Sequence, residues 1–212
     1  MPLPSPKLLH VDEALIVAEK PAGLLSVPAA GREDCLVSRI QVLYPDALIV
    51  HRLDQATSGL ILLARGAGML RRLSLAFEQR IIGKRYVALV QGHPASDEGE
   101  IDLALAEDPA CRPRQRVDPV HGRRALTRYR VLARSAGGEA AFSRVELKPV
   151  TGRTHQLRVH LLAIGHPILG DPLYAPPASV AAHARLHLHA AGLALMHPHT
   201  RLPLQFDSPV PF

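Results

Sequence analysis

Short runs of apolar residues, many of them β-branched, alternate with polar segments along most of the chain. In the N-terminal third, Ala14–Ala18, Leu48–Val50 and Leu60–Leu63 predict buried strands. The second and third runs bracket a polar insert of nine residues, 51–59. A side chain on such an insert is exposed to a ligand while the flanking strands fix its position. This insert is therefore the first place to look for a functional group.

The rest of the chain mixes strand and helix patterns. Alternation predicts strands over 85–92, 124–132, 141–149 and 185–190, and residues 135–138 indicate a turn. Helical spacing of apolar residues predicts helices over 37–44, 66–82 and 155–164, the last with Thr154 as N-cap and Gly165 as its stop. Residues 106–120, rich in Pro and Arg, indicate a loop. Many short strands with only two convincing helices favour an α+β fold.

Composition limits the classes of protein. The length of 212 residues fits one compact domain, although two small ones remain open, and a mean hydropathy of +0.07 indicates a soluble protein. No apolar run reaches the length of a membrane span, and the N-terminus lacks a secretory signal, so we expect a cytoplasmic protein without membrane contact. Cys35 and Cys111 form neither a disulfide framework nor a zinc knuckle. The net charge of +6 favours a polyanionic partner.

Three other kinds of site have weak signals. Gly66 and Gly68 follow a strand and open a helix, but Arg71 replaces the third glycine of a dinucleotide-binding fingerprint. Four histidines gather near the C-terminus, without the paired cysteines or H-E-x-x-H pattern of a zinc site: His187, His189, His197 and His199. No G-x-S-x-G elbow supports a serine hydrolase. We therefore expect neither a cofactor nor a metal.

Several residues could serve either structure or chemistry. Asp54 lies on the polar insert, where a loop aspartate commonly accepts amide hydrogen bonds or pairs with an arginine. Tyr86, at the start of a strand, has the ordinary role of a core-edge residue. The alternating guanidinium groups of Arg112, Arg114 and Arg116 point the same way if the segment is extended, and could then meet successive phosphates. The residues alone leave these alternatives open.

Longer motifs carry a resemblance to a known family. His51-Arg52-Leu53-Asp54 followed by Thr57-Ser58-Gly59-Leu60 resembles the catalytic motif of the RluA-type pseudouridine synthases. The resemblance extends over about Leu9–Phe212 through further matching segments: Lys20-Pro21-x-Gly23 with Ser26-Val27-Pro28, Lys84-x-Tyr86, the run Gly152–His160, Gly165–Ile168, Gly170-Asp171 and Tyr174. The segment around Arg112–Arg116 is similar to the corresponding loop of the dual-specificity members, which modify both large-subunit rRNA and tRNA.

The resemblance implies a fold and a reaction. The fold is a mixed, mostly antiparallel sheet with flanking helices, in one catalytic domain over residues 1–212 without the S4-type RNA-binding domain found in many members. The reaction isomerises uridine to pseudouridine in structured RNA, 23S rRNA or tRNA, by base flipping and without cofactor. The expected partner is RNA, with no protein partner and a monomeric enzyme. A non-catalytic RNA-binding or RNA-folding protein on the same scaffold remains the alternative.

The resemblance also assigns roles to residues. Asp54 is the catalytic carboxylate, Arg158 pairs with it, and Tyr86 and Leu157 contact the uracil. Arg52 enters the RNA and fills the space that the flipped base leaves, because a planar cation both stacks and donates hydrogen bonds. His51 joins the substrate-binding residues by its place in the motif. The remaining RNA contacts are assigned to Arg112, Arg114 and Arg116.

Overall fold

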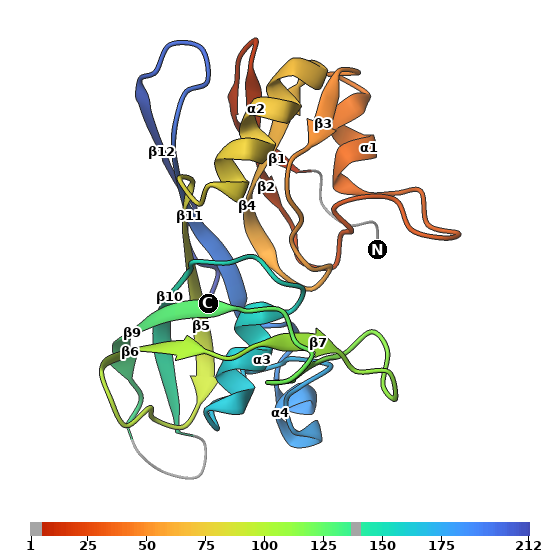
Figure 1. Ribbon diagram of the computed structural model, residues 1–212. Helices are drawn as coiled ribbons and strands as arrows, with labels where there is room; N and C mark the ends of the chain where they lie inside the picture. Colours follow the sequence, from red (N-terminus) through yellow and green to blue (C-terminus); the bar gives the residue numbers. More distant parts are fainter. Residues whose placement is uncertain (1–5, 137–140) are drawn as a thin grey trace. The chain divides into compact units, whose positions relative to one another are not determined.

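A computed structural model describes residues 6–136 and 141–212, which fold into two compact units (Figure 1). Unit 1 comprises Met1–Lys84 and His189–Pro211, and unit 2 comprises Arg85–Leu188 with Phe212. The second half of the turn expected at 135–138 falls on residues 137–140, outside the described residues. The described residues contain four helices: the three that the patterns predict and a short one that they do not.

Unit 1 holds most of the N-terminal strands and two helices. Its strands lie in the order β1-β2-β4-β11, with β3 beside β4 and β12 beside β11. The pairing of β4 with β11 is parallel, and the other ladders described in this unit are antiparallel. Its elements are β1 (Lys7–Val11), β2 (Leu15–Lys20), α1 (Leu36–Gln41), β3 (Ala47–Ile49), β4 (Ser58–Arg65), α2 (Gly66–Glu78), β11 (Leu188–Met196) and β12 (Pro203–Asp207).

The core of unit 1 lies between its sheet and α2. Alternate residues of β2 and β4 are buried on the side of the sheet that α2 covers, where Leu73 inserts among them. The helix ends at Glu78, earlier than the expected 82, and Arg80 two residues later has a left-handed backbone with φ of 60°. The predicted strands at 48–50 and 60–63 are confirmed as β3 and β4, so the polar insert is a loop between rigid strands.

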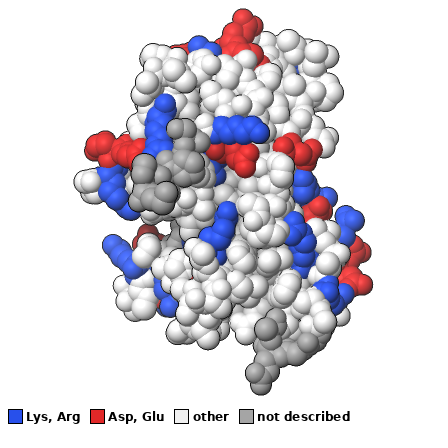
Figure 2. All heavy atoms as spheres, turned by 180° about the vertical axis from the view of Figure 1, so that it is seen from behind, with Lys and Arg blue, Asp and Glu red and all other residues white. Residues whose placement is uncertain are grey.

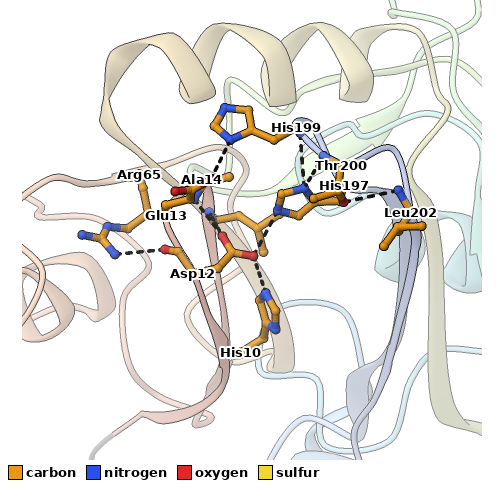
Figure 3. A network of polar contacts seen from close by, with 10 residues as sticks. His10, Asp12, Glu13, Ala14, Arg65, His197, His199, Thr200 and Leu202 are labelled. Atoms are coloured by element: carbon orange, nitrogen blue, oxygen red, sulfur yellow. Dashed lines mark hydrogen bonds and ion pairs between the residues drawn. The ribbon is translucent and has the colours of Figure 1, made fainter.

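The turn between β1 and β2 is tied to the β11–β12 hairpin by one carboxylate (Figure 3). Asp12 accepts hydrogen bonds from the amides of Ala14 at 2.7 Å and Leu15 at 2.9 Å. Its other oxygen lies 2.6 Å from Nε2 of His10 and 3.1 Å from Nε2 of His197. Burial opposes the charge, but the hydrogen bonds prevail and lower the pKa of Asp12 to about 2.

Unit 2 is built on a second antiparallel set of strands, in the order β5-β10-β9-β6, with β7 and β8 forming a separate two-stranded ribbon. Helix α3 packs against β8 and β9. The first two residues of β5 count with unit 1. The elements are β5 (Gly83–Gln91), β6 (Glu98–Asp102), β7 (Leu105–Glu107), β8 (Gln115–Val117), β9 (Leu126–Arg134), β10 (Phe142–Pro149), α3 (Gln156–Ala163) and α4 (Pro177–Ala182).

The start of α3 differs from the expected one. His155, not Thr154, occupies the N-cap, with a left-handed backbone at φ of 54° and no side-chain cap. Gln156 organises the turn before the helix: its Oε1 accepts from Thr151 Oγ1 at 2.7 Å and from the Arg153 amide at 3.0 Å. The expectation of Thr154 was wrong because the chain turns at His155, whose left-handed backbone places the first helical residue at Gln156.

Candidate active site

Asp54 lies on the loop between β3 and β4, where buried and exposed side chains alternate. Arg52 is exposed, Leu53 is buried and Asp54 is partly exposed. The amide of Thr57 donates to the carbonyl of Asp54 at 3.1 Å, closing a turn directly after the carboxylate. A ligand can reach Asp54, while buried residues on either side hold its backbone.

A second loop clamps the residues on both sides of Asp54. Ser26 Oγ donates to the carbonyl of Leu53 at 2.8 Å and accepts from its amide at 3.1 Å. Gln55 Nε2 donates to the carbonyl of Gly23 at 2.9 Å, and the amide of Gly23 donates to the carbonyl of Gln55 at 2.8 Å. These reciprocal pairs limit the movement of the carboxylate relative to its unit.

A fully buried lysine supports the same clamp. Lys20 has no exposed surface, and its ammonium group donates to three carbonyl oxygens, those of Pro21 at 3.0 Å, Leu24 at 2.8 Å and Gln55 at 3.1 Å. A buried charge is tolerated where hydrogen bonds replace its water shell. Lysine is ordinarily exposed, so composition gives no hint of this role, and the Lys-Pro-x-Gly motif is the only sequence signal for it.

His51 opens the loop and is held by structural contacts. Its Nε2 accepts the amide hydrogen of Leu62 at 3.1 Å, and its ring packs on Phe77 of α2 with centroids 4.5 Å apart. Burial, and to a lesser extent the charge of Lys84, lower the pKa of His51 to about 3, so the ring is neutral at physiological pH. The assignment of His51 to substrate binding stays a prediction.

The end of the loop is fixed by a buried chain of three side chains. Ser58 Oγ lies 2.7 Å from Nδ1 of His189, and Nε2 of His189 lies 2.9 Å from Ser208 Oγ. His189 is 1% exposed, although the alternation at 185–190 sets it on the opposite side from the apolar residues. Its hydrogen-bonding partners come from distant parts of the sequence, and alternation within one strand cannot reveal them.

Arg158, in unit 2, is one of the most tightly held side chains of the chain. It is 3% exposed, and Asp171, with no exposed surface, binds it through two hydrogen bonds, from Nε at 2.8 Å and from Nη2 at 2.7 Å. Asp171 also accepts the amides of Leu173 and Tyr174. Asp171 appeared in the sequence only as part of a motif. The two hydrogen bonds with Asp171 fix the orientation of the Arg158 guanidinium group.

The other two residues assigned to the base also belong to unit 2. Leu157, beside Arg158 in α3, is 7% exposed. Tyr86 lies on β5 opposite Leu147 of β10 and is partly exposed. The strand predicted at 85–92 is confirmed, with β5 beginning two residues earlier. Contacts of Leu157 and Tyr86 with uracil stay predictions.

The segment 106–120, expected as a loop, contains a β-ribbon of β7 and β8. The three arginines do not share one extended strand, so their expected common direction does not hold: Arg112 lies 3.6 Å from Glu107, Arg114 lies over the ring of Tyr174, and Arg116 lies 3.2 Å from Asp118. Side chains of Arg112 and Arg116 are 77% and 53% exposed. Exposed ion pairs are weak, and a phosphate can compete for such arginines.

Positive charge on the surface is interspersed with negative charge. On the face seen in Figure 2, Lys and Arg side chains are spread out and lie close to Asp and Glu. In unit 2, for example, Arg128 of β9 pairs with Glu100 of β6 at 2.7 Å, and Arg124 pairs with Asp102 at 3.1 Å. The net charge of +6 therefore does not form one continuous patch on that face.

Among residues 6–136 and 141–212, no group of three His, Cys, Asp or Glu side chains is arranged to hold a metal ion. In the same ranges, no helix is long and apolar enough to cross a membrane. His197 instead bonds Asp12, as described above.

Comparisons with known proteins agree with this architecture. The family profile described as RNA pseudouridylate synthase matches residues 14–163. The dual-specificity RNA pseudouridine synthases RluA of Yersinia pestis and Escherichia coli K12 are 46% and 47% identical over 207 residues, which are 97% of this chain and 99% and 93% of theirs.

Two solved human structures are similar in fold. Human RNA Pseudouridylate Synthase Domain Containing 1 aligns with a TM-score of 0.83 at 27% identity, over 98% of this chain and 84% of its own. Domain Containing 4 aligns with a TM-score of 0.81 at 27% identity, over 97% and 88%. The mixed, mostly antiparallel α+β fold is thus confirmed. Because the profile spans both the clamped Asp54 loop and the whole of α3, the chain belongs to the RNA pseudouridylate synthase family.

Proposed function

We propose that this chain isomerises specific uridines to pseudouridine in both large-subunit rRNA and tRNA, with Asp54 as the catalytic carboxylate. The observation that carries the proposal is the loop of Asp54: a partly exposed carboxylate, clamped on both sides, within a motif that matches the family. Identity of 46–47% to dual-specificity enzymes over 97% of the chain supports the choice of both RNAs.

The reaction needs a carboxylate and no cofactor. The bond from N1 to C1′ breaks, the uracil rotates, and C5 bonds to C1′. The proton on C5 leaves to solvent and N1 gains a proton, so product and substrate are isomers. Asp54 acts either as a nucleophile on the sugar or by stabilising a cationic sugar, and is then released. No redox step or second substrate is involved.

Residues of unit 2 complete the proposed site. Arg158 pairs with Asp54 in this proposal, which suits a guanidinium group that is already buried and held in one geometry by Asp171. Tyr86 and Leu157 contact the uracil, and the partial exposure of Tyr86 leaves its ring accessible. In this proposal the two units form one catalytic domain.

Target selection requires extrusion of the base. A uridine in a stem or structured loop is reached only after unstacking, and exposed Arg52 fills the vacated space. Exposed Arg112 and Arg116, with Arg114, contact phosphates around the target. We propose that the enzyme acts in the cytoplasm and that RNA is its partner. We also propose that it is a monomer, which light scattering of the free protein and of its RNA complex tests.

The test uses two transcripts. The purified protein is incubated with unmodified tRNA and with a fragment of 23S rRNA, and pseudouridine is mapped by carbodiimide treatment and reverse transcription. New stops in both RNAs support dual specificity, whereas a stop in one restricts the substrate to that RNA. Absence of stops in both, with RNA binding retained, favours the non-catalytic alternative.

A further inference from the structure

Tyr174 joins two parts of unit 2 through its hydroxyl group. The amide of Gln115, the first residue of β8, donates to the hydroxyl oxygen at 2.7 Å. The same oxygen lies 2.7 Å from Nδ1 of His155, the N-cap residue of α3. One phenol therefore connects the strand that follows Arg114 to the entry of the helix that carries Arg158.

The ring and backbone of Tyr174 hold the same two parts. The guanidinium carbon of Arg114 lies 5.2 Å from the ring centroid and that of Arg158 lies 5.0 Å from it. The Tyr174 amide donates to Asp171 Oδ1 at 3.2 Å, the oxygen that also binds Arg158. Tyr174 is 5% exposed, so these contacts are shielded from competition by water.

We propose that Tyr174 is a positioning residue that couples the β7–β8 ribbon to Arg158, so that RNA bound by the ribbon is held in register with the catalytic arginine. The inference rests on the proposed function for the roles of the ribbon and of Arg158. It goes beyond that function by assigning a role to a residue that does not touch the substrate.

The physical basis is the loss of a hydroxyl group that both parts share. Without the hydroxyl, the Gln115 amide and the His155 ring each lose a partner in a site that is only partly wet. The ribbon then moves independently of the helix, and small displacements of a catalytic group reduce the rate strongly. The left-handed backbone of His155 makes the helix entry dependent on such side-chain support.

The test compares three variants with the wild type. Tyr174→Phe removes the hydroxyl and keeps the ring beside both arginines. His155→Asn removes the imidazole but retains a residue type that tolerates a left-handed backbone. Tyr44→Phe is the matched control, because its ring also lies beside an arginine, Arg65 at 5.1 Å, in the other unit.

Hydrogen exchange of the RNA-free protein gives a readout that needs no substrate. In Tyr174→Phe we expect exchange at least about tenfold faster both at the Gln115 amide and in the first turn of α3, because both lose the shared phenol. We expect His155→Asn to accelerate exchange in α3 and, more weakly, at Gln115. Faster exchange at Gln115 alone overturns the coupling.

Kinetics at a temperature where all variants are folded gives the second readout. We expect Tyr174→Phe to raise KM for RNA and to lower kcat about tenfold or more, with Tyr44→Phe unchanged. Wild-type kcat and KM in Tyr174→Phe overturn the proposal. If the wild type itself makes no pseudouridine, the proposed function fails, and hydrogen exchange alone then decides whether the two parts are coupled.

Discussion

At the scale of single residues, the position of the Asp54 loop is fixed by buried polar side chains that form hydrogen bonds with backbone groups. Lys20 binds three carbonyl oxygens around the Asp54 loop, and Ser26 brackets Leu53 with both its donor and its acceptor. Such groups contribute little where water can replace them and much where it cannot. The precision of the site therefore depends on residues that the reaction does not use.

Lys20→Met tests this at the same scale. Methionine fills similar volume but leaves three carbonyls without the ammonium donor, so we expect the free energy of unfolding to fall by about 3 kcal/mol or more and kcat to decrease. Urea unfolding monitored by circular dichroism measures the change. The control is Lys7→Met, at an exposed position, with an expected change within about 0.5 kcal/mol. Equal stability of the two variants contradicts the account.

At the scale of elements, close approach of β4 and β11 fixes the position of the end of the Asp54 loop. A Cβ at Gly59 would lie 2.3 Å from the carbonyl oxygen of Ala190, and the backbone there has φ of 111°. Only glycine permits this approach, since both the backbone angle and the space exclude a side chain. In unit 2, Arg116 of β8 and Arg112 in the turn before it are exposed.

Gly59→Ala is expected to destabilise unit 1 by at least about 3 kcal/mol, because the new methyl group meets backbone atoms that cannot move without breaking the parallel pairing. Thermal unfolding measures the loss. Gly68→Ala in α2 has nothing within 4 Å of the added Cβ, and we expect it to stabilise the protein by about 0.5–1 kcal/mol. A tolerated Gly59→Ala would show that the strands are not so close.

Arg112→Ala tests the ribbon as an RNA-binding element. Its side chain is 77% exposed, so the fold should be unaffected, while the affinity for RNA falls and the slope of log K against log salt decreases by about 1. Fluorescence anisotropy across a salt series measures both. Arg128→Ala, at a 62% exposed and ion-paired arginine of β9, serves as the control with no expected change. An unchanged slope for Arg112→Ala contradicts a phosphate contact.

At the scale of the whole molecule, the sequence patterns predicted local elements better than they predicted contacts between distant residues. β3, β4, β5 and α2 follow from runs and periodicity within a few residues, and the loop of Asp54 follows from its flanking strands. The burial of His189 and Lys20 could not be predicted, because it depends on partners far away in sequence. The ribbon at 105–117 pairs residues that are close in sequence, but its Pro and Arg residues favoured a loop. The functional assignment came from motifs that are distributed over both units.

The Asp12 network predicts how unit 1 responds to acid (Figure 3). The pKa of Asp12 is lowered from 3.8 to about 2, so the ionised carboxylate stabilises the folded state at neutral pH, and this contribution is lost as the pH falls from about 4 to about 2. Its size is on the order of 1–2 kcal/mol, allowing for solvent screening. Asp12→Asn lacks it at every pH. Urea unfolding should show a difference from the wild type at neutral pH that shrinks below about pH 4. A difference independent of pH would contradict this.

The central claim is that Asp54 catalyses isomerisation of uridine in RNA. RNA transcripts labelled with tritium at C5 of uridine test it most directly, because C5 exchanges its hydrogen for a bond to C1′ and the label passes to water. We expect the wild type to release one tritium per uridine modified, and Asp54→Asn to bind the same RNA, with an unchanged circular dichroism spectrum, but to release none. Release by Asp54→Asn at the wild-type rate, or no release by the wild type from rRNA and tRNA transcripts, would contradict the account.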